Sequence, residues 1–292
     1  MQLYSIDQLS QITGLNKILI RTWENRYDFL IPKRTSTNIR LYDDKMLTKS
    51  IKYAILVDAG YKISKLVTYN LQEINNLVKE TLEETQDHNT KHKIYIAKFI
   101  ESAIYFDQEL FSKAYKSCIE EIGIIKFYKN ILIPTMNQIG ILFLNSKITP
   151  ANEHFLSENI RIKISYEIEQ TKTSVKKEQK PWVLFMPEYE YHDIGLLFTY
   201  LMLKKKNQRV IYLGQNTPIE SLIKFNEDHN LLCFLNTKKA QIKLKDLILF
   251  LNNNFKKSMI YIATREKIFS STTKNIQIIQ KLEDLEKILK KI

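Results

Sequence analysis

A histidine stands between two acidic residues, just before a glycine, in the segment PEYEYHDIG at residues 187–195. These residue types could do three kinds of chemistry: the His192 imidazole could bind a metal, act as a general base, or be a polar residue at a helix start. No second cysteine or histidine lies nearby at zinc-ligand spacing, and the sequence shows no nucleophile for a base to activate. Spacing alone therefore favours the helix-start interpretation.

The elements around this segment give His192 a defined place. After Pro181, the apolar runs WVLFM, RVIYL, LLCFL and SMIYI alternate with helical stretches, which predicts a parallel, doubly wound, Rossmann-like sheet. Ligands of such sheets bind at the carboxyl ends of strands. The loops after the first three runs hold His192, Gly214–Asn216 and Asn236–Thr237, so we expect them to meet at one rim. There a neighbouring carboxylate could fix the tautomer of the histidine.

A second group of residues that could do chemistry lies in the first seventy positions. Two short helices are expected around a turn at Gly14, with Asn16 as the N-cap of the second helix. On that helix Lys17, Arg21 and Asn25 fall about one turn apart and share a face that could enter a major groove. A loop and short ribbon after Pro32 carry residues suited to gripping phosphates, namely Lys33, Arg34, Asn38, Arg40 and Tyr42. A small helical domain with a solvated basic face is the alternative.

The middle of the chain predicts a helical bundle. Apolar residues recur at three and four from Leu71 to about Thr173, and four amphipathic helices are expected within 91–107, 108–123, 127–146 and 150–169. The polar segment KTSVKKEQKP then predicts a domain boundary. We therefore expect a winged helix-turn-helix domain at 1–75, a helical bundle at 76–175 and an α/β domain at 176–292.

Composition limits the function classes. A chain of 292 residues with 44% hydrophobic content predicts several folded modules, and a net charge of +12 favours a polyanionic partner. The two cysteines, Cys118 and Cys233, match neither a disulfide framework nor a zinc site. No run reaches the roughly 18 apolar residues of a membrane span, and no signal peptide is recognisable. We therefore expect a cytoplasmic protein.

The N-terminal segments RTWENRY, PKRT, NIRLYDD and DAGYKISKL resemble the MerR family of winged helix-turn-helix transcription regulators over about seventy residues. The resemblance implies a homodimer or higher oligomer that bends promoter DNA. It implies supporting roles for Trp23 and Tyr27. Asp28 departs from the family's usual glycine, but aspartate tolerates the left-handed conformation. The DNA contacts that the resemblance implies are Lys17, Arg21, Arg26, Arg34, Arg40 and Tyr42.

The bundle followed by an α/β module resembles the cobalamin-binding region of methionine synthase and of the CarH/LitR photoreceptor regulators. In those regulators an E-x-H-x-x-G loop carries the histidine that ligates cobalt, and a tryptophan followed after nine residues by Glu-His caps the corrin. Here the loop spans Glu190 to Gly195, and phenylalanine replaces the cap tryptophan. The cofactor-binding residues implied are His192 as cobalt ligand, Glu190, Asp193, Gly195, Phe143, Glu153, His154 and Thr237.

Two departures bear on this cofactor. The family's α/β domain has a Gly-Gly pair after the fourth strand, where glycine lets the cofactor's nucleotide tail approach the backbone. The corresponding residues here are Ala263, Thr264 and Arg265, whose side chains are expected to crowd that slot. In the loop after the third strand Thr237 is retained, but Lys238 and Lys239 add bulk.

The expected function is that of a DNA-binding regulator, not an enzyme. By resemblance, adenosylcobalamin would stabilise an operator-bound oligomer, and photolysis of its cobalt–carbon bond would release the DNA. One alternative is a regulator that no longer binds cobalamin and uses the α/β module for another ligand or a protein partner. A corrinoid carrier in methyl transfer is a further alternative, which the basic wing disfavours.

Overall fold

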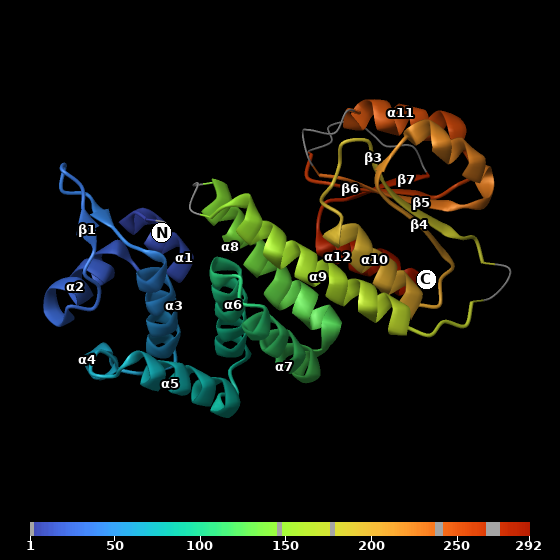
Figure 1. Ribbon diagram of the computed structural model, residues 1–292. Helices are drawn as coiled ribbons and strands as arrows, with labels where there is room; N and C mark the ends of the chain where they lie inside the picture. Colours follow the sequence, from blue (N-terminus) through green and yellow to red (C-terminus); the bar gives the residue numbers. More distant parts are fainter. Residues whose placement is uncertain (1–2, 145–147, 176–178, 237–241, 267–274) are drawn as a thin grey trace. The chain divides into compact units, whose positions relative to one another are not determined.

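The computed structural model describes residues 3–144, 148–175, 179–236, 242–266 and 275–292 (Figure 1). The chain divides into two compact units, residues 1–156 and 157–292. The first is helical apart from a two-stranded ribbon, and the second contains a five-stranded sheet, as the predicted multidomain α and α/β fold requires. Among the described residues, no helix combines the length and the apolar character needed to cross a bilayer.

The predicted helix-turn-helix is present and its ends have local causes. Helix α1 (Ile6–Thr13) begins with a capping box between Ser5 and Gln8 and ends at Gly14, which has φ 75°. Helix α2 (Lys17–Tyr27) begins at Asn16, whose side chain accepts a hydrogen bond from the Ile18 amide. It ends at Asp28, which adopts the left-handed conformation expected for it, with φ 47°.

A short ribbon and a long helix complete this module. Strands β1 (Lys33–Arg34) and β2 (Arg40–Leu41) pair antiparallel, and Tyr4 forms an isolated bridge with Tyr42. Asp43 caps helix α3 through the Met46 amide. The helices that follow the ribbon are α3 (Asp44–Asp58), α4 (Ile63–Leu66) and α5 (Leu71–Glu84).

The bundle helices match the four expected segments, with two irregularities. Gly123 kinks the second of these helices with a non-helical backbone (φ 74°, ψ 163°). A π-helical turn, η1 (Tyr128–Leu132), stands two residues before Pro134, because proline lacks an amide hydrogen and its ring disfavours a regular preceding turn. Phe99 packs edge-on against Phe111 and Phe127, with ring centroids 5.4 and 5.6 Å apart. The bundle helices are α6 (His88–Tyr105), α7 (Gln108–Phe127), α8 (Ile133–Leu144) and α9 (Pro150–Gln170), the last of which continues into the second unit.

The second unit is a parallel, doubly wound sheet with strand order β4-β3-β5-β6-β7. Its four longer strands are those predicted; β7 was not predicted, because its four residues are too few to show a pattern. The segment after β4 is a 3₁₀-helix instead of an α-helix. The elements are β3 (Trp182–Pro187), α10 (Ile194–Lys205), β4 (Val210–Thr217), η2 (Ile219–Asp228), β5 (Asn230–Leu235), α11 (Leu244–Asn254), β6 (Ile260–Thr264), β7 (Ile276–Ile279) and α12 (Leu282–Lys291).

Apolar side chains bury both faces of this sheet. Helix α11 and η2 cover one face, and α10 and α12 cover the other (Figure 1). The strand order reverses between β3 and β5, since β4 lies on one side of β3 and all later strands lie on the other. In such sheets a ligand crevice forms at this reversal, outside the carboxyl ends of the two strands.

We predict that Gly195→Ala destabilises the α/β unit by about 1–3 kcal/mol, because a side chain here overpacks a filled core. A Cβ atom at Gly195 would lie 2.7 Å from Cε1 of the buried Phe234. Gly140→Ala, where a Cβ meets nothing within 4 Å, is the control and should not destabilise. Calorimetry of the full-length proteins measures this, and equal melting of Gly195→Ala and wild type would contradict it.

Candidate functional site

Helix α2 presents its predicted functional residues on one exposed face. Lys17, Arg21, Asn25 and Arg26 are exposed, whereas Ile20 and Trp23 are buried on the opposite side of the helix. Lys17 also forms an ion pair with Asp7 of α1. The sequence therefore separates a cationic outer face from an apolar inner face, and the outer face has the charge that a duplex phosphate backbone attracts.

The ribbon adds further cations beside this helix in the same unit. Lys33 and Arg34 are exposed, and the Arg34 guanidinium donates a 2.7 Å hydrogen bond to the Asn38 side chain. Asn38 has φ 64°, and its amide donates to the Thr35 carbonyl, which closes the turn between the strands. The Arg34 side chain is thus held at the turn of a short wing.

A buried carboxylate joins the wing to α2. Glu24 is 7% exposed and accepts a 2.9 Å hydrogen bond from Arg40 Nε and a 2.5 Å hydrogen bond from the Tyr42 hydroxyl. The Arg40 side chain keeps 21% exposure, so it is partly accessible. This carboxylate was not identified from the sequence, although Glu24 follows Ile20 by one helical turn and so falls on the apolar face.

The position of Tyr42 differs from the one expected. Its side chain is completely buried, and burial raises the pKa of its hydroxyl, with the hydrogen bond to Glu24 adding to the effect. A residue in this position supports the wing from inside and does not offer its hydroxyl to DNA. The expected direct contact is therefore replaced by a supporting role, because the chain needs a donor for the Glu24 carboxylate.

The acidic-histidine segment lies in the loop after β3, at the strand-order reversal. Glu190 is completely buried, and its Oε1 accepts hydrogen bonds from the Tyr191 and His192 amides at 3.2 and 3.3 Å. Its Oε2 accepts a 2.8 Å hydrogen bond from the Asn236 amide, which follows β5. The carboxylate therefore connects the two loops that flank the reversal.

His192 is held by the same carboxylate while its side chain is 73% exposed. His192 Nδ1 lies 3.1 Å from Glu190 Oε1. Because an ionised carboxylate only accepts hydrogen bonds, this contact places the proton of a neutral imidazole on Nδ1 and the lone pair on Nε2. A carboxylate–histidine pair of this kind orients and strengthens a metal-ligating nitrogen.

The carboxyl end of β4 reaches the same rim. The Asn216 side chain accepts a 3.0 Å hydrogen bond from the Tyr189 amide, and the Gln215 side chain donates a 2.9 Å hydrogen bond to the Tyr191 carbonyl. The carboxyl ends of β3, β4 and β5, which were expected to converge, thus each contribute residues to this rim. Thr237, Lys238 and Lys239 lie outside the described residues.

Asp193 and Gly195 serve the packing of this loop. Arg161 of α9 donates two hydrogen bonds to Oδ1 of the buried Asp193 carboxylate, from Nε at 3.1 Å and from Nη2 at 2.9 Å. The same guanidinium forms an ion pair with Glu158. Gly195 allows the first turn of α10 to lie against Phe234. The Asp193 carboxylate thus forms an ion pair that holds α9 to the start of α10.

The cap residues lie at the ends of successive bundle helices. Phe143 is 44% exposed near the end of α8, and Glu153 and His154 stand in the first turns of α9, where the His154 side chain is 71% exposed. His154 Nε2 lies 3.8 Å from a Glu153 carboxylate oxygen. Asn152 anchors this turn by donating to the Ala103 carbonyl of α6 at 2.9 Å. These residues belong to the first unit, whereas His192 belongs to the second.

The end of β6 is filled by side chains. Ala263 and Thr264 are 6% and 2% exposed, and the Thr264 hydroxyl accepts a hydrogen bond from the Glu266 amide. His192 at this rim thus fits a metal ligand, whereas the end of β6 carries two side chains at the positions where the resemblance implies glycines. Within the described ranges, no three histidine, cysteine or acidic side chains form a metal-ion cluster.

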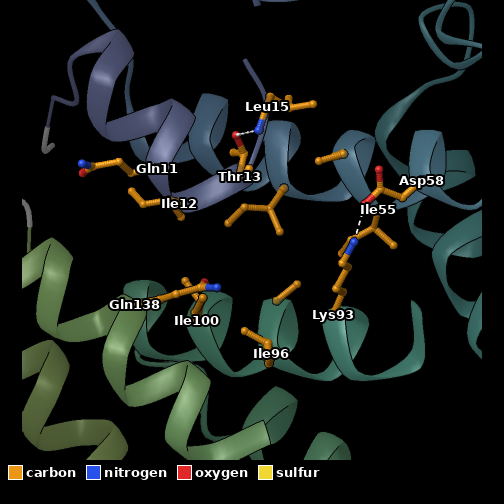
Figure 2. A pocket seen from close by; sticks show the side chains of 14 residues that line it. Gln11, Ile12, Thr13, Leu15, Ile55, Asp58, Lys93, Ile96, Ile100 and Gln138 are labelled. Carbon is orange, nitrogen blue, oxygen red and sulfur yellow. Dashed lines mark hydrogen bonds and ion pairs between the residues drawn. The ribbon is translucent and has the colours of Figure 1, made fainter. Parts of the chain in front are cut away.

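A cavity that sequence reasoning did not anticipate lies within the first unit. It has a volume of about 310 Å³ and is lined by residues of α1, α3, α6 and α8 (Figure 2). Ile12, Ile55, Ile96 and Ile100 line it, and an ion pair between Asp58 and Lys93 stands at one end. Scattered apolar residues of four helices carry no local motif, so no sequence signal identifies it.

Comparison with known proteins assigns both regions. Residues 4–78 match the family described as MerR HTH family regulatory protein, and residues 95–166 match the family described as B12 binding domain. The chain is 26% identical over 221 residues to the HTH-type transcriptional repressor CarH of Myxococcus xanthus, covering 75% of this chain and 73% of that protein. It is 21% identical over 218 residues to the repressor CarA of the same organism, covering 74% and 70%.

A solved structure supports the fold of the later part of the chain. The monomethylamine corrinoid protein of Methanosarcina barkeri aligns with a TM-score of 0.52 and 16% sequence identity, covering 68% of this chain and 96% of that one. At this identity the likeness concerns the fold alone. The chain therefore carries a helix-turn-helix region that matches the MerR family model and a later region that matches the B12-binding family model, and it resembles the repressors CarH and CarA over about three quarters of its length.

Proposed function

We propose that the protein regulates transcription by binding promoter DNA through the exposed face of α2 and the wing. The observation that carries the proposal is that two elements joined through the Glu24 carboxylate both carry exposed cations, Lys17, Arg21 and Arg26 on α2 and Lys33 and Arg34 on the wing. An overall charge of +12 adds a long-range attraction to phosphate. In this arrangement α2 enters the major groove, and the wing contacts the flanking backbone.

The wing must keep a fixed position relative to α2 for both to bind at once. The ribbon has only two residues in each strand, so its own hydrogen bonds hold it weakly. Glu24 supplies the missing constraint, because its carboxylate binds both Arg40 and Tyr42 from the inner face of α2. DNA binding therefore depends on a group that does not touch the DNA.

We further propose that the protein is a repressor that acts as a homodimer or a higher homo-oligomer in the cytoplasm, where the promoter is. The similarity to the repressors CarH and CarA supports repression. Two copies would present two α2 helices to half-sites about one helical turn apart, and bending of the intervening DNA would add to specificity. This role requires no catalytic residue.

Removing two exposed cations should weaken DNA binding uniformly. In Arg21→Ala with Arg34→Ala, we expect the affinity for a bound duplex to fall at least about ten-fold and the salt dependence to become shallower by about one counterion per lost phosphate contact. Fluorescence anisotropy at several salt concentrations measures both. Lys113→Ala with Lys287→Ala removes two equally exposed charges elsewhere and should keep the wild-type salt slope; equal behaviour of the two double variants would refute the interface.

The inward position of Tyr42 predicts a separation of stability from affinity. Tyr42→Phe leaves the buried ring in place but removes one donor from Glu24, so the free energy of unfolding should fall by about 1–2 kcal/mol. The folded variant should bind DNA within about two-fold of wild type, since Arg40 still ties the wing to Glu24 and other residues make the DNA contacts. Chemical denaturation and anisotropy measure the two quantities. If the stability were unchanged and the affinity fell strongly, the result would instead support a direct contact between the Tyr42 hydroxyl and DNA.

We propose that the α/β unit senses a corrinoid, with His192 Nε2 as the cobalt ligand and adenosylcobalamin as the natural form. The buried Glu190 carboxylate supports this, because it fixes the orientation and the tautomer of an exposed imidazole at the ligand-binding edge of the sheet. Phe143, Glu153 and His154 would cover the other side of the ring. Once bound, such a group supplies a light-sensitive cobalt–carbon bond, and differential affinity between two assemblies would turn its loss into release of DNA.

The filled end of β6 favours a second candidate, a regulator whose α/β unit no longer holds cobalamin and binds another ligand or a protein. Ala263 and Thr264 are buried there, at the positions where the resemblance implies a pair of glycines that would let a nucleotide tail approach the backbone. Reduced space at the tail lowers affinity without removing the histidine ligand. The two candidates therefore differ in whether cobalamin stays bound at micromolar concentration.

We expect the full-length protein, mixed with adenosylcobalamin in the dark and desalted, to retain the pigment in proportion to protein. His192→Ala should lose it or show the visible spectrum of cobalamin without a protein ligand, while the control His88→Ala, at an exposed histidine of α6, should behave as wild type. Ala263→Gly with Thr264→Gly should retain more pigment than wild type. A colourless wild type together with a colourless glycine variant would exclude the corrinoid sensor.

A further inference from the structure

An isoleucine stands exposed on the basic face of α2. Ile18 is 71% exposed, although it is the second residue of a helix whose inner face buries Ile20 and Trp23. An apolar side chain in this position adds little to the core of the module. Single exposed apolar residues are common on protein surfaces, so what bears on function is the position of Ile18 on the face that the proposed function turns toward DNA.

The spacing of α2 aligns Ile18 with the polar residues that face DNA in the proposed function. Ile18, Arg21 and Asn25 are separated by three and four residues, so they form one stripe along the exposed side of the helix. In helix-turn-helix proteins, residues near the N-terminus of the second helix reach base edges in the major groove. Ile18 is at that end, whereas the longer Lys17 and Arg21 side chains can reach phosphates.

The chemistry of the groove selects a partner for this side chain. Base edges in the major groove offer hydrogen-bond donors and acceptors, and their one apolar group is the C5-methyl of thymine. We propose that Ile18 packs against a thymine methyl group and makes the protein select an A·T pair at one position of each half-site. This inference rests on the proposed DNA-binding function and adds a determinant of its sequence specificity.

The charge around Ile18 favours DNA over an apolar protein surface as its partner. Lys17, Arg21 and Arg26 are exposed on the same helix, and a protein partner would have to cover these cations as well as the isoleucine. A duplex satisfies both requirements, because its phosphates neutralise the cations while the groove receives the methyl contact.

The test uses duplexes that the full-length protein selects from a random pool. Each thymine of a selected duplex is replaced singly by deoxyuridine, which lacks only the C5-methyl group. For wild type, one replacement per half-site should weaken binding about four-fold, the value expected for one buried methyl group. In Ile18→Ala the same replacement should change affinity by less than about 1.5-fold, because the contact is already absent.

Two variants serve as controls. Ile18→Val retains branched methyl groups and should keep the sensitivity to deoxyuridine, and Leu249→Ala truncates a 59% exposed side chain of α11 and should match wild type. Melting of Ile18→Ala should be unchanged, since the side chain is exposed. Two results would overturn the inference about Ile18 while leaving the proposed DNA-binding function intact. In one, wild type binds selected duplexes but no effect of deoxyuridine depends on Ile18. In the other, Ile18→Ala weakens binding to thymine and deoxyuridine duplexes alike. If no duplex is selected, the proposed DNA-binding function fails.

Discussion

A carboxylate removed from water must be fully hydrogen-bonded, and this constraint organises both functional regions. Glu24 satisfies it by drawing Arg40 and Tyr42 onto the inner face of α2, so the two-residue strands of the wing gain a fixed position. Glu190 satisfies it with three amides and the His192 ring, and so joins the loops after β3 and β5. In each case the buried acid makes no contact with the proposed ligand, yet it sets where the neighbouring basic group stands.

Much of the architecture could be predicted from local patterns. Asn16, Gly14 and Asp28 mark the ends of helices through rules that act within a few residues, and apolar runs such as WVLFM identify buried parallel strands. Residues whose roles depend on distant partners could not be assigned in this way. Tyr42 and Asp193 look like polar residues suited to a ligand, but Glu24 and Arg161 engage them inside the fold.

The two regions differ in how far they carry the features that the resemblances imply. The helix-turn-helix module carries exposed cations, capped helices and an internal ion pair between Arg40 and Glu24. The α/β unit keeps the carboxylate–histidine pair at the strand-order reversal, while side chains at Ala263 and Thr264 fill the end of β6. A ligand-binding edge and a tail slot are separate parts of such a fold, so one can change while the other persists.

The cavity between α1, α3, α6 and α8 has a mechanical consequence for the first unit. Closely interlocked helices resist sliding, because every displacement breaks many dispersion contacts at once. Beside the direct contact of α3 with α6, where Lys52 donates a 2.7 Å hydrogen bond to Glu101, a space of about 310 Å³ leaves fewer contacts to break, and the half-exposed Asp58–Lys93 pair can lengthen into water at little energetic cost. The junction is thus rigid along the α3–α6 contact and more compliant at the cavity, where a small displacement forfeits few dispersion contacts.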